Sequence, residues 1–149
     1  MSNPSLIEKS MDLLGWRRVV SALANHACSP ITRDQCRKLK PENDFNCAQN
    51  LLAETTEMIA LLDSLDSFPM DHFEDLSPVF KDAEEQKIIE SGQCLALIKL
   101  LCLCRNLCRE RDKKTIYPHL FAWLENLDPL KELLDDLVRC VDNEGNIRE

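Results

Sequence analysis

Cysteine is the residue type whose side chain could do the most chemistry in this sequence of 149 residues, which contains eight cysteines. Four of the eight fall within residues 91–113, where Cys104 and Cys108 are one helical turn apart and could share a metal ion. A structural zinc site needs paired spacings such as C-x-x-C with a second pair, and the sequence contains no C-x-x-C. Free cysteine behaves as a small, usually buried apolar residue. We therefore predict reduced, buried thiols at Cys94, Cys102, Cys104 and Cys108, and neither disulfides nor a metal site.

Other catalytic arrangements have little support in the residue spacing. A cysteine–histidine pair would require His26, His72 or His119 to fold against an exposed thiolate. The many carboxylates lie on predicted helix faces beside lysines and arginines, which is typical of a solvated surface. The three glycines are isolated and form no phosphate-binding loop. We expect no catalytic residue and no cofactor-binding residue in this chain.

One positive patch follows the most apolar stretch. It consists of Arg105, Arg109, Arg111, Lys113 and Lys114. Five positive charges could contact the phosphate backbone of DNA or RNA. Glu110 and Asp112 lie among them, however, and positive residues are common at helix C-termini because they interact with the negative end of the helix dipole. The five residues are candidate nucleic-acid contacts, with helix capping as the alternative.

The overall composition indicates a helical protein that does not bind nucleic acid by itself. A formal charge of -8 and a pI near 4.9 repel phosphate backbones. Apolar residues make up 44% of the sequence, which is enough for the core of one domain. Few glycines and aromatic residues favour helices over sheets. Residues 1–15 lack the features of a signal peptide, so we expect a cytoplasmic protein with reduced thiols.

The positions of apolar residues predict an all-α, bundle-like core. Its centre is a helix over residues 91–113 with Ser91 as N-cap, apolar enough that we expect it to be buried. The run is too short for a bilayer and carries Lys99 in its middle, so we predict no membrane span. A second long helix, from Phe45 to about residue 65, has a packing stripe with alternating steps of three and four: Phe45, Ala48, Leu52, Thr55, Ile59 and Leu62.

Shorter helices precede and follow these two. Trp16 leads one with Val20, Leu23 and Ala27 on one face, and Ser29 caps the next. Ser77 begins a further short helix after an irregular stretch at residues 66–75. Pro118 and Pro129 restart the chain in two helices, whose inward residues are Leu120, Phe121, Leu124 and Leu127 in the first and Leu130, Leu133, Leu134, Leu137, Val138 and Val141 in the second.

Several short stretches resemble the N-terminal region of the second branch of the bacterial MutS family. The stretches are Leu14 to Ala24, Ser29 to Ile31, Leu39 to Pro41, Leu52 to Glu57, Phe73 to Leu76 with Ala83, and Val141 to Ile147. They match the L-E-[FW], L-x-P, L-x-E-T-x-E, D-[IL] and I-D-x-x-G-x-[IV] elements of that branch. Gly15, Thr32, Lys81 and Asp82 depart from its pattern. The resemblance extends over nearly the whole chain but includes no catalytic signature.

This resemblance implies a function for a longer parent protein. The chain would be the first half of a helical core that links an ATPase dimer to lever helices, in a protein linked to recombination suppression, DNA repair or ribosome rescue. ATP, Mg²⁺ and a nuclease-like domain would belong to the parent beyond Glu149, and no catalytic residue carries over to this chain. The implied partners are the rest of the parent chain, a second copy, and DNA or ribosomes through the parent.

Two further expectations complete this interpretation. The alternative to a core segment is a stand-alone acidic adaptor that binds a protein partner. We also expect self-association, because the last helix has an apolar face wide enough to pack on two sides.

Overall fold

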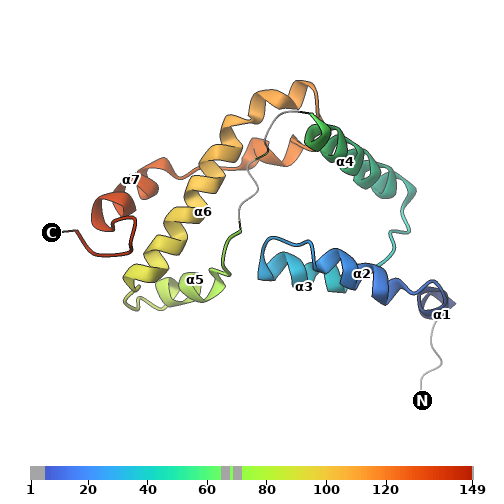
Figure 1. Cartoon of the computed structure of the whole chain (residues 1–149), viewed down its shortest axis with the longest axis horizontal. Helices are drawn as coiled ribbons and strands as arrows, with labels where there is room; N and C mark the ends of the chain where they lie inside the picture. The colour runs from blue at the N-terminus through green and yellow to red at the C-terminus, as the bar shows by residue number, and fades with distance from the viewer. Residues whose placement is uncertain (1–5, 65–67, 69–71, 149) are drawn as a thin grey trace, which may run out of the picture. The chain divides into compact units, whose positions relative to one another are not determined.

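The structure, a computed structural model, describes residues 6–64, 68 and 72–148. Helices form nearly all of its regular structure (Figure 1). The α-helices are α1 (Leu6–Leu13), α2 (Trp16–Ala24), α3 (Pro30–Lys38), α4 (Phe45–Asp63), α5 (Ser77–Glu84), α6 (Ser91–Arg109) and α7 (Lys131–Cys140). Two short 3₁₀ helices are η1 (Arg111–Thr115) and η2 (Ala122–Asn126). The predicted all-α fold is confirmed. Half of the predicted loop at residues 66–75 lies outside the described residues.

Residues 1–41 and 42–149 form two compact units. In the first unit, α2 packs on α3, and the Trp16 indole Nε1 donates a 2.9 Å hydrogen bond to the Leu39 carbonyl. Ser29 caps α3 as predicted, because its buried Oγ accepts from the Thr32 N–H. The predicted face of α2 is only partly right. Ala24 is buried with Val20, whereas Leu23 is 47% exposed.

The core of the second unit is a cluster of four buried residues: Leu61, Leu120, Phe121 and Leu124. Leu61 comes from the C-terminal end of α4, and the other three come from the segment between η1 and η2 and from η2 itself. Phe68 packs edge-on against Phe121, with ring centroids 6.0 Å apart. Of the four residues predicted to point inward after Pro118, three are buried and Leu127 is partly buried against them, although they lie in turns and a 3₁₀ helix instead of an α-helix.

The predicted packing stripe of α4 is wrong. Asp44 caps the helix, accepting from the Cys47 N–H at 2.8 Å. However, Leu52 and Ile59 are 66% and 56% exposed, and Leu61 from the opposite side enters the core. The heptad pattern identified a face able to pack, but α4 is apolar on more than one side, so the pattern could not decide which face this chain buries.

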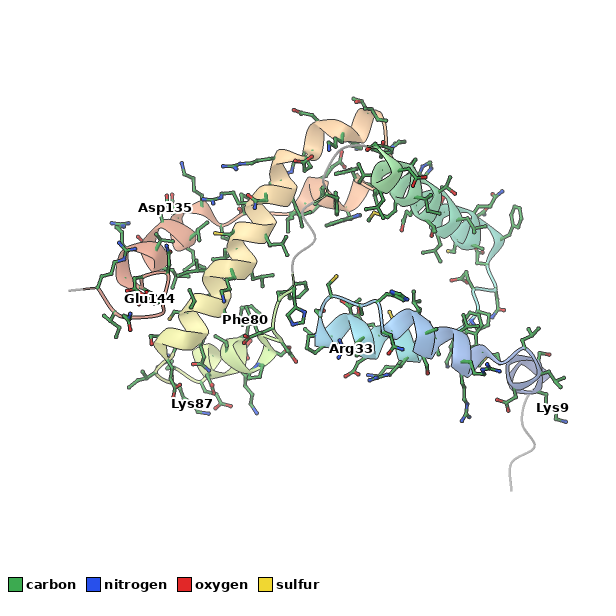
Figure 2. The ribbon with its side chains drawn as sticks, in the orientation of Figure 1. Lys9, Arg33, Phe80, Lys87, Asp135 and Glu144 are labelled. Carbon is green, nitrogen blue, oxygen red and sulfur yellow. The ribbon has the colours of Figure 1, made fainter. Side chains whose placement is uncertain are left out.

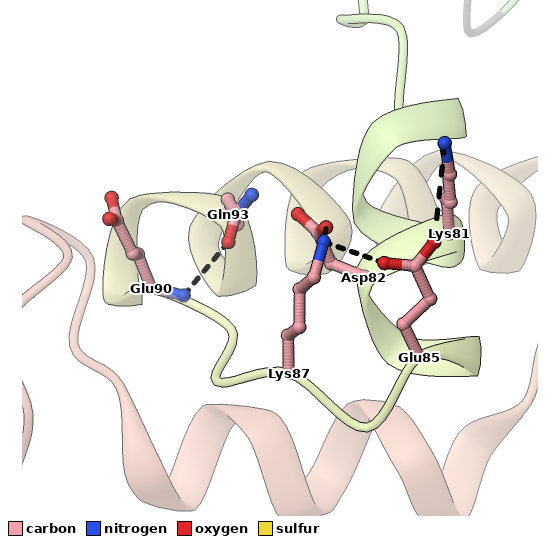
Figure 3. A network of polar contacts seen from close by, with 6 residues as sticks. All are labelled: Lys81, Asp82, Glu85, Lys87, Glu90 and Gln93. Carbon is pink, nitrogen blue, oxygen red and sulfur yellow. Dashed lines mark hydrogen bonds and ion pairs between the residues drawn. The ribbon is translucent and has the colours of Figure 1, made fainter.

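The central helix α6 begins and ends slightly differently from the prediction. Glu90, not Ser91, is its N-cap, and the Glu90 N–H donates a 2.8 Å hydrogen bond to Gln93 Oε1 in a capping box (Figure 3). The helix stops at Arg109, and the basic residues that follow form η1. Ser91 is not the N-cap because Glu90 and Gln93 each bond to a backbone N–H of the other, so the helix is capped one residue earlier.

The expected burial of α6 is also wrong. Of its residues only Leu101 and Leu103 are buried, and Cys94, Cys102, Cys104 and Cys108 are half-buried. The helix is apolar around most of its circumference, but within this unit α7 covers only one side of it (Figure 1). The other apolar residues of α6 are therefore only half-buried in this structure.

A set of ion pairs fixes the loop between α5 and α6 (Figure 3). Lys87 Nζ lies 3.2 Å from Asp82 Oδ1 and 2.6 Å from Glu85 Oε2. Ser77 begins α5 as predicted, and its N–H donates to Asp75 Oδ1. The three side chains of the Lys87 group all belong to the end of α5 and the following loop, so they set where the chain turns toward α6.

Helix α7 packs against α6 with one narrow face. Leu134 and Val141 are buried, whereas Leu130, Leu133 and Val138 are exposed, so the predicted wide apolar face is only partly covered. A tight turn follows the helix, closed by an antiparallel bridge between Val141 and Ile147. Asp142 Oδ1 accepts from the N–H groups of Glu144 and Asn146, both at 2.8 Å. Asp135 on the helix and Glu144 in the turn are exposed (Figure 2).

Candidate functional site

An open groove of about 600 Å³ runs along α6. It is lined by His72, Phe73 and Asn143 and by six residues of α6, which we call the groove floor: Leu95, Ile98, Lys99, Cys102, Leu103 and Asn106. The floor comes from successive turns of one helix because residues three and four apart share a helix face. Lys99 is exposed. The groove is thus mainly apolar with one cation, a surface suited to packing more than to chemistry.

The groove brings one predicted histidine and one predicted cysteine together. His72 and Cys102 both line it, but the polar contact of Cys102 is with Arg105 Nη2, 3.8 Å from the sulfur. His119 contacts a carboxylate instead of a thiol, and His26 is exposed. The structure thus provides no activated cysteine–histidine pair among the residues that it describes.

All eight cysteines are free in this structure. Burial, with a smaller contribution from the neighbouring Cys108, raises the pKa of the Cys104 thiol, which makes this thiol a poor nucleophile. Cys108 Sγ donates to the Leu127 carbonyl at 3.4 Å. No group of three or more His, Cys, Asp or Glu side chains within the described ranges could hold a metal ion.

The positive patch is largely occupied by contacts within the chain. Arg111 Nε donates to the Leu124 carbonyl at 3.1 Å, and its Nη2 donates to the Leu127 carbonyl. Lys113 pairs with Glu110, and Lys114 pairs with Glu125.

Of the five predicted residues, Arg105 is half-buried and Arg109 is exposed. The Nε atom of Arg105 is buried without a hydrogen-bond partner among the described residues. The structure does not assemble the five charges into one free surface, and nucleic-acid contact stays a prediction.

The polar contact that sequence reasoning missed is centred on Glu57. Its carboxylate accepts hydrogen bonds from the N–H groups of His119 and Leu120, at 3.2 and 2.7 Å, and contacts the His119 ring Nδ1 at 2.7 Å. An anion at the start of a turn stabilises the unpaired N–H groups there. Glu57 therefore joins α4 to a turn more than 60 residues later in the chain.

The pKa of Glu57 reflects this geometry. Burial of the carboxyl acts to raise its pKa, but the hydrogen bonds from Leu120 and His119 outweigh burial and lower the pKa below its ordinary value. From its residue type and spacing alone, Glu57 looks like a solvated helix residue. No sequence signal marked it, because only the structure shows that Leu61, four residues later on the same side of α4, enters the core.

Within the described residues, α6 is also the helix that is long and apolar enough to cross a membrane by length and composition alone. It has 19 residues and a mean hydropathy of 1.2 over its best window. The core helix of a soluble protein meets the same two criteria, so they do not separate a membrane span from a packing helix.

Comparisons with known proteins give consistent relatives. No protein-family model matches the sequence, and no solved structure matches it. Proteins named Endonuclease MutS2 do match. The protein of Alkaliphilus oremlandii is 23% identical over 145 residues, covering 95% of this chain and 18% of the relative. The Geobacillus protein is 24% identical over 93% of the chain, and the Clostridium beijerinckii protein is 25% identical over 95%.

The matches cover very different shares of this chain and of its relatives. They cover nearly the whole chain, yet the chain spans only about 18% of the length of these relatives. They confirm the resemblance that the sequence motifs predicted: this chain is a MutS2-like relative, similar over almost all of its length to one part of the proteins named Endonuclease MutS2.

Proposed function

We propose that this chain is a non-catalytic helical scaffold, a core segment of a MutS2-like ATPase that connects the ATPase dimer to the lever helices. The observation that carries the proposal is the uncovered apolar surface of α6, where Leu95 and Ile98 are only half-buried in the floor of the groove. An apolar groove at the surface of a soluble protein is a common site for packing against another segment. The rest of a parent chain would supply the cover.

The share of each protein that the match covers supports the same proposal. The match covers 95% of this chain but 18% of the Alkaliphilus oremlandii protein, as expected for one structural segment of a larger protein. ATP, Mg²⁺, DNA or ribosomes would then be bound by other parts of the parent, in the cytoplasm. This chain would contribute rigidity and packing surface.

A chimera tests the scaffold role. The matched segment of the Alkaliphilus oremlandii protein is replaced by these 149 residues, and soluble yield and thermal unfolding are compared with those of a variant that lacks the segment. We expect the chimera to unfold cooperatively and the deletion variant to aggregate. Ile98→Asp in the chimera places a charge on the groove floor and should lower the unfolding temperature.

The control is Ile88→Asp, because Ile88 is 93% exposed in the loop before α6 and does not line the groove. A chimera no more stable than the deletion variant would argue against the scaffold. The same result would favour the stand-alone adaptor, since an adaptor has no need to fit the remainder of a MutS2-like chain.

A further inference from the structure

Helix α4 is attached to the rest of the second unit at its C-terminal end. Glu57 bonds there to the turn at His119 and Leu120, and Leu61 joins the buried cluster. Leu61 is the buried residue of this helix, whereas Phe45 at the other end is 72% exposed. Figure 1 shows the same arrangement, since α4 (green) meets the segment of η1 and η2 with its C-terminal end and extends away from it.

The helix closes its own ends without help from distant residues. Asp44 caps its start, and at its end the Ser64 hydroxyl donates a 2.6 Å hydrogen bond to the Leu61 carbonyl. The hydroxyls of Thr55 and Thr56 donate to backbone carbonyls one turn earlier in the same helix. With 19 residues, α4 is also longer than the roughly 12–15 residues below which an isolated helix is marginal in water. Helix α4 can therefore detach with its own hydrogen bonds intact.

Two contacts form the attachment, which we call the α4 anchor. One is the Glu57 carboxylate with the N–H groups of His119 and Leu120, and the other is the packing of Leu61 in the cluster around Phe121. The His119 side chain is 50% exposed, so water reaches this turn and can replace the carboxylate when it leaves. A region held by few buried apolar contacts and by hydrogen bonds near solvent opens at a lower free energy than the whole fold.

We propose that α4 is a movable cover, which detaches as one piece when the α4 anchor opens, while α6 stays packed on α7. Detachment uncovers the apolar cluster around Phe121 together with the two N–H groups that Glu57 caps. This surface fits a helix with a carboxylate one turn before a leucine, which is the spacing of Glu57 and Leu61. Helix α4 thus occupies an acceptor surface of its own chain. The proposal does not depend on the proposed scaffold function, which rests on α6.

Amide hydrogen exchange of the whole chain, followed by NMR at several urea concentrations below the unfolding transition, tests this opening. The Leu120 amide reports on the α4 anchor because it donates to Glu57, and the amides of Leu101 and Leu103, the buried residues of α6, report on the remainder of the unit. The Leu120 amide and the amides in the last turns of α4 should be at least about tenfold less protected than those of α6. Their exchange should also depend less on urea, because detachment exposes less surface than unfolding.

Two variants show whether the α4 anchor controls the opening. Glu57→Gln should speed exchange at Leu120 and in the last turns of α4 by about tenfold, because a charged acceptor is lost. Glu54→Gln is the control on the same helix, since Glu54 makes no hydrogen bond with any described residue, and it should leave these rates unchanged.

Two results would overturn the proposal. One is equal protection and equal urea dependence for the Leu120 amide and the α6 amides, since α4 would then detach only when the whole unit unfolds. The other is the same exchange rate at Leu120 in Glu57→Gln and in the parent chain, because the carboxylate would then not hold α4 in place.

Discussion

Glu57 Oε2 lies 2.7 Å from the backbone nitrogen of Leu120, which donates a hydrogen bond to it across 63 positions of the sequence. The carboxylate takes the place of an N-cap residue for the turn at His119 and Leu120. The buried Leu61 lies one helical turn after Glu57, so the polar contact and the apolar core hold the same two segments together.

Stability should depend on the charge of Glu57. Its pKa in the folded chain is below the ordinary value of 4.5. A carboxyl with a lowered pKa contributes stability that is present above its unfolded pKa and is lost as the pH falls through its folded pKa. We expect Glu57→Gln to lower the urea midpoint at pH 7 and to reduce the loss of stability between about pH 5 and pH 3. The measurement is urea unfolding over that pH range.

Glu132→Gln serves as the control, because Glu132 is exposed on α7. The interpretation of Glu57 as a carboxylate cap would be wrong if both variants showed the same pH dependence.

The neighbouring leucines at positions 61 and 62 should respond very differently to truncation. Leu61 is fully buried and Leu62 is 61% exposed. Leu61→Ala should cost about 2–5 kcal/mol of unfolding free energy through lost burial and a cavity, whereas Leu62→Ala should cost less than about 0.5 kcal/mol. Urea unfolding at a concentration low enough to keep the chain monomeric measures both. Equal costs would mean that Leu62 is buried as well, as the packing stripe predicted from the heptad pattern requires.

Arg111 should matter for stability more than for binding. It donates hydrogen bonds to the Leu124 and Leu127 carbonyls, so Arg111→Met should cost about 1–2 kcal/mol because the guanidinium contacts are lost. Arg109 is exposed, and Arg109→Met should cost less than about 0.5 kcal/mol. Thermal unfolding compares the two. Equal stability, together with a larger loss of DNA binding in Arg111→Met, would instead support a nucleic-acid contact.

The thiols should differ in reactivity. Cys140 is exposed, whereas Cys104 is half-buried and its pKa is raised by burial, so Cys140 should react with a thiol reagent first and Cys104 slowly at neutral pH. Cys47 is exposed too, but its hydrogen bond with Asp44 raises its pKa and should slow it. Thiol labelling followed by absorbance measures this. The fast labelling phase should be missing in Cys140→Ser and present in Cys104→Ser. Fast labelling at Cys104 would mean that α6 opens readily in solution.

Local signals predicted the helices well because they act within a few residues. The Ser29 cap of α3 lies where the sequence indicates, and the helices predicted to start at Trp16 and Phe45 begin at those residues. The inward side chains Leu120, Phe121 and Leu124 were also identified, although the short 3₁₀ geometry of their segment was not.

Sequence by itself determined that the chain is helical, where most helices begin and end, and which known proteins it resembles, because capping and apolar period are written in neighbouring residues. Tertiary structure alone decided which face of each helix is buried. On α4 and α6 apolar residues occupy several sides, so local periodicity leaves the choice of face open, and the choice falls to contacts between distant segments. Glu57 and Leu61 meet residues about 60 positions away. No spacing rule within one helix could have revealed that contact.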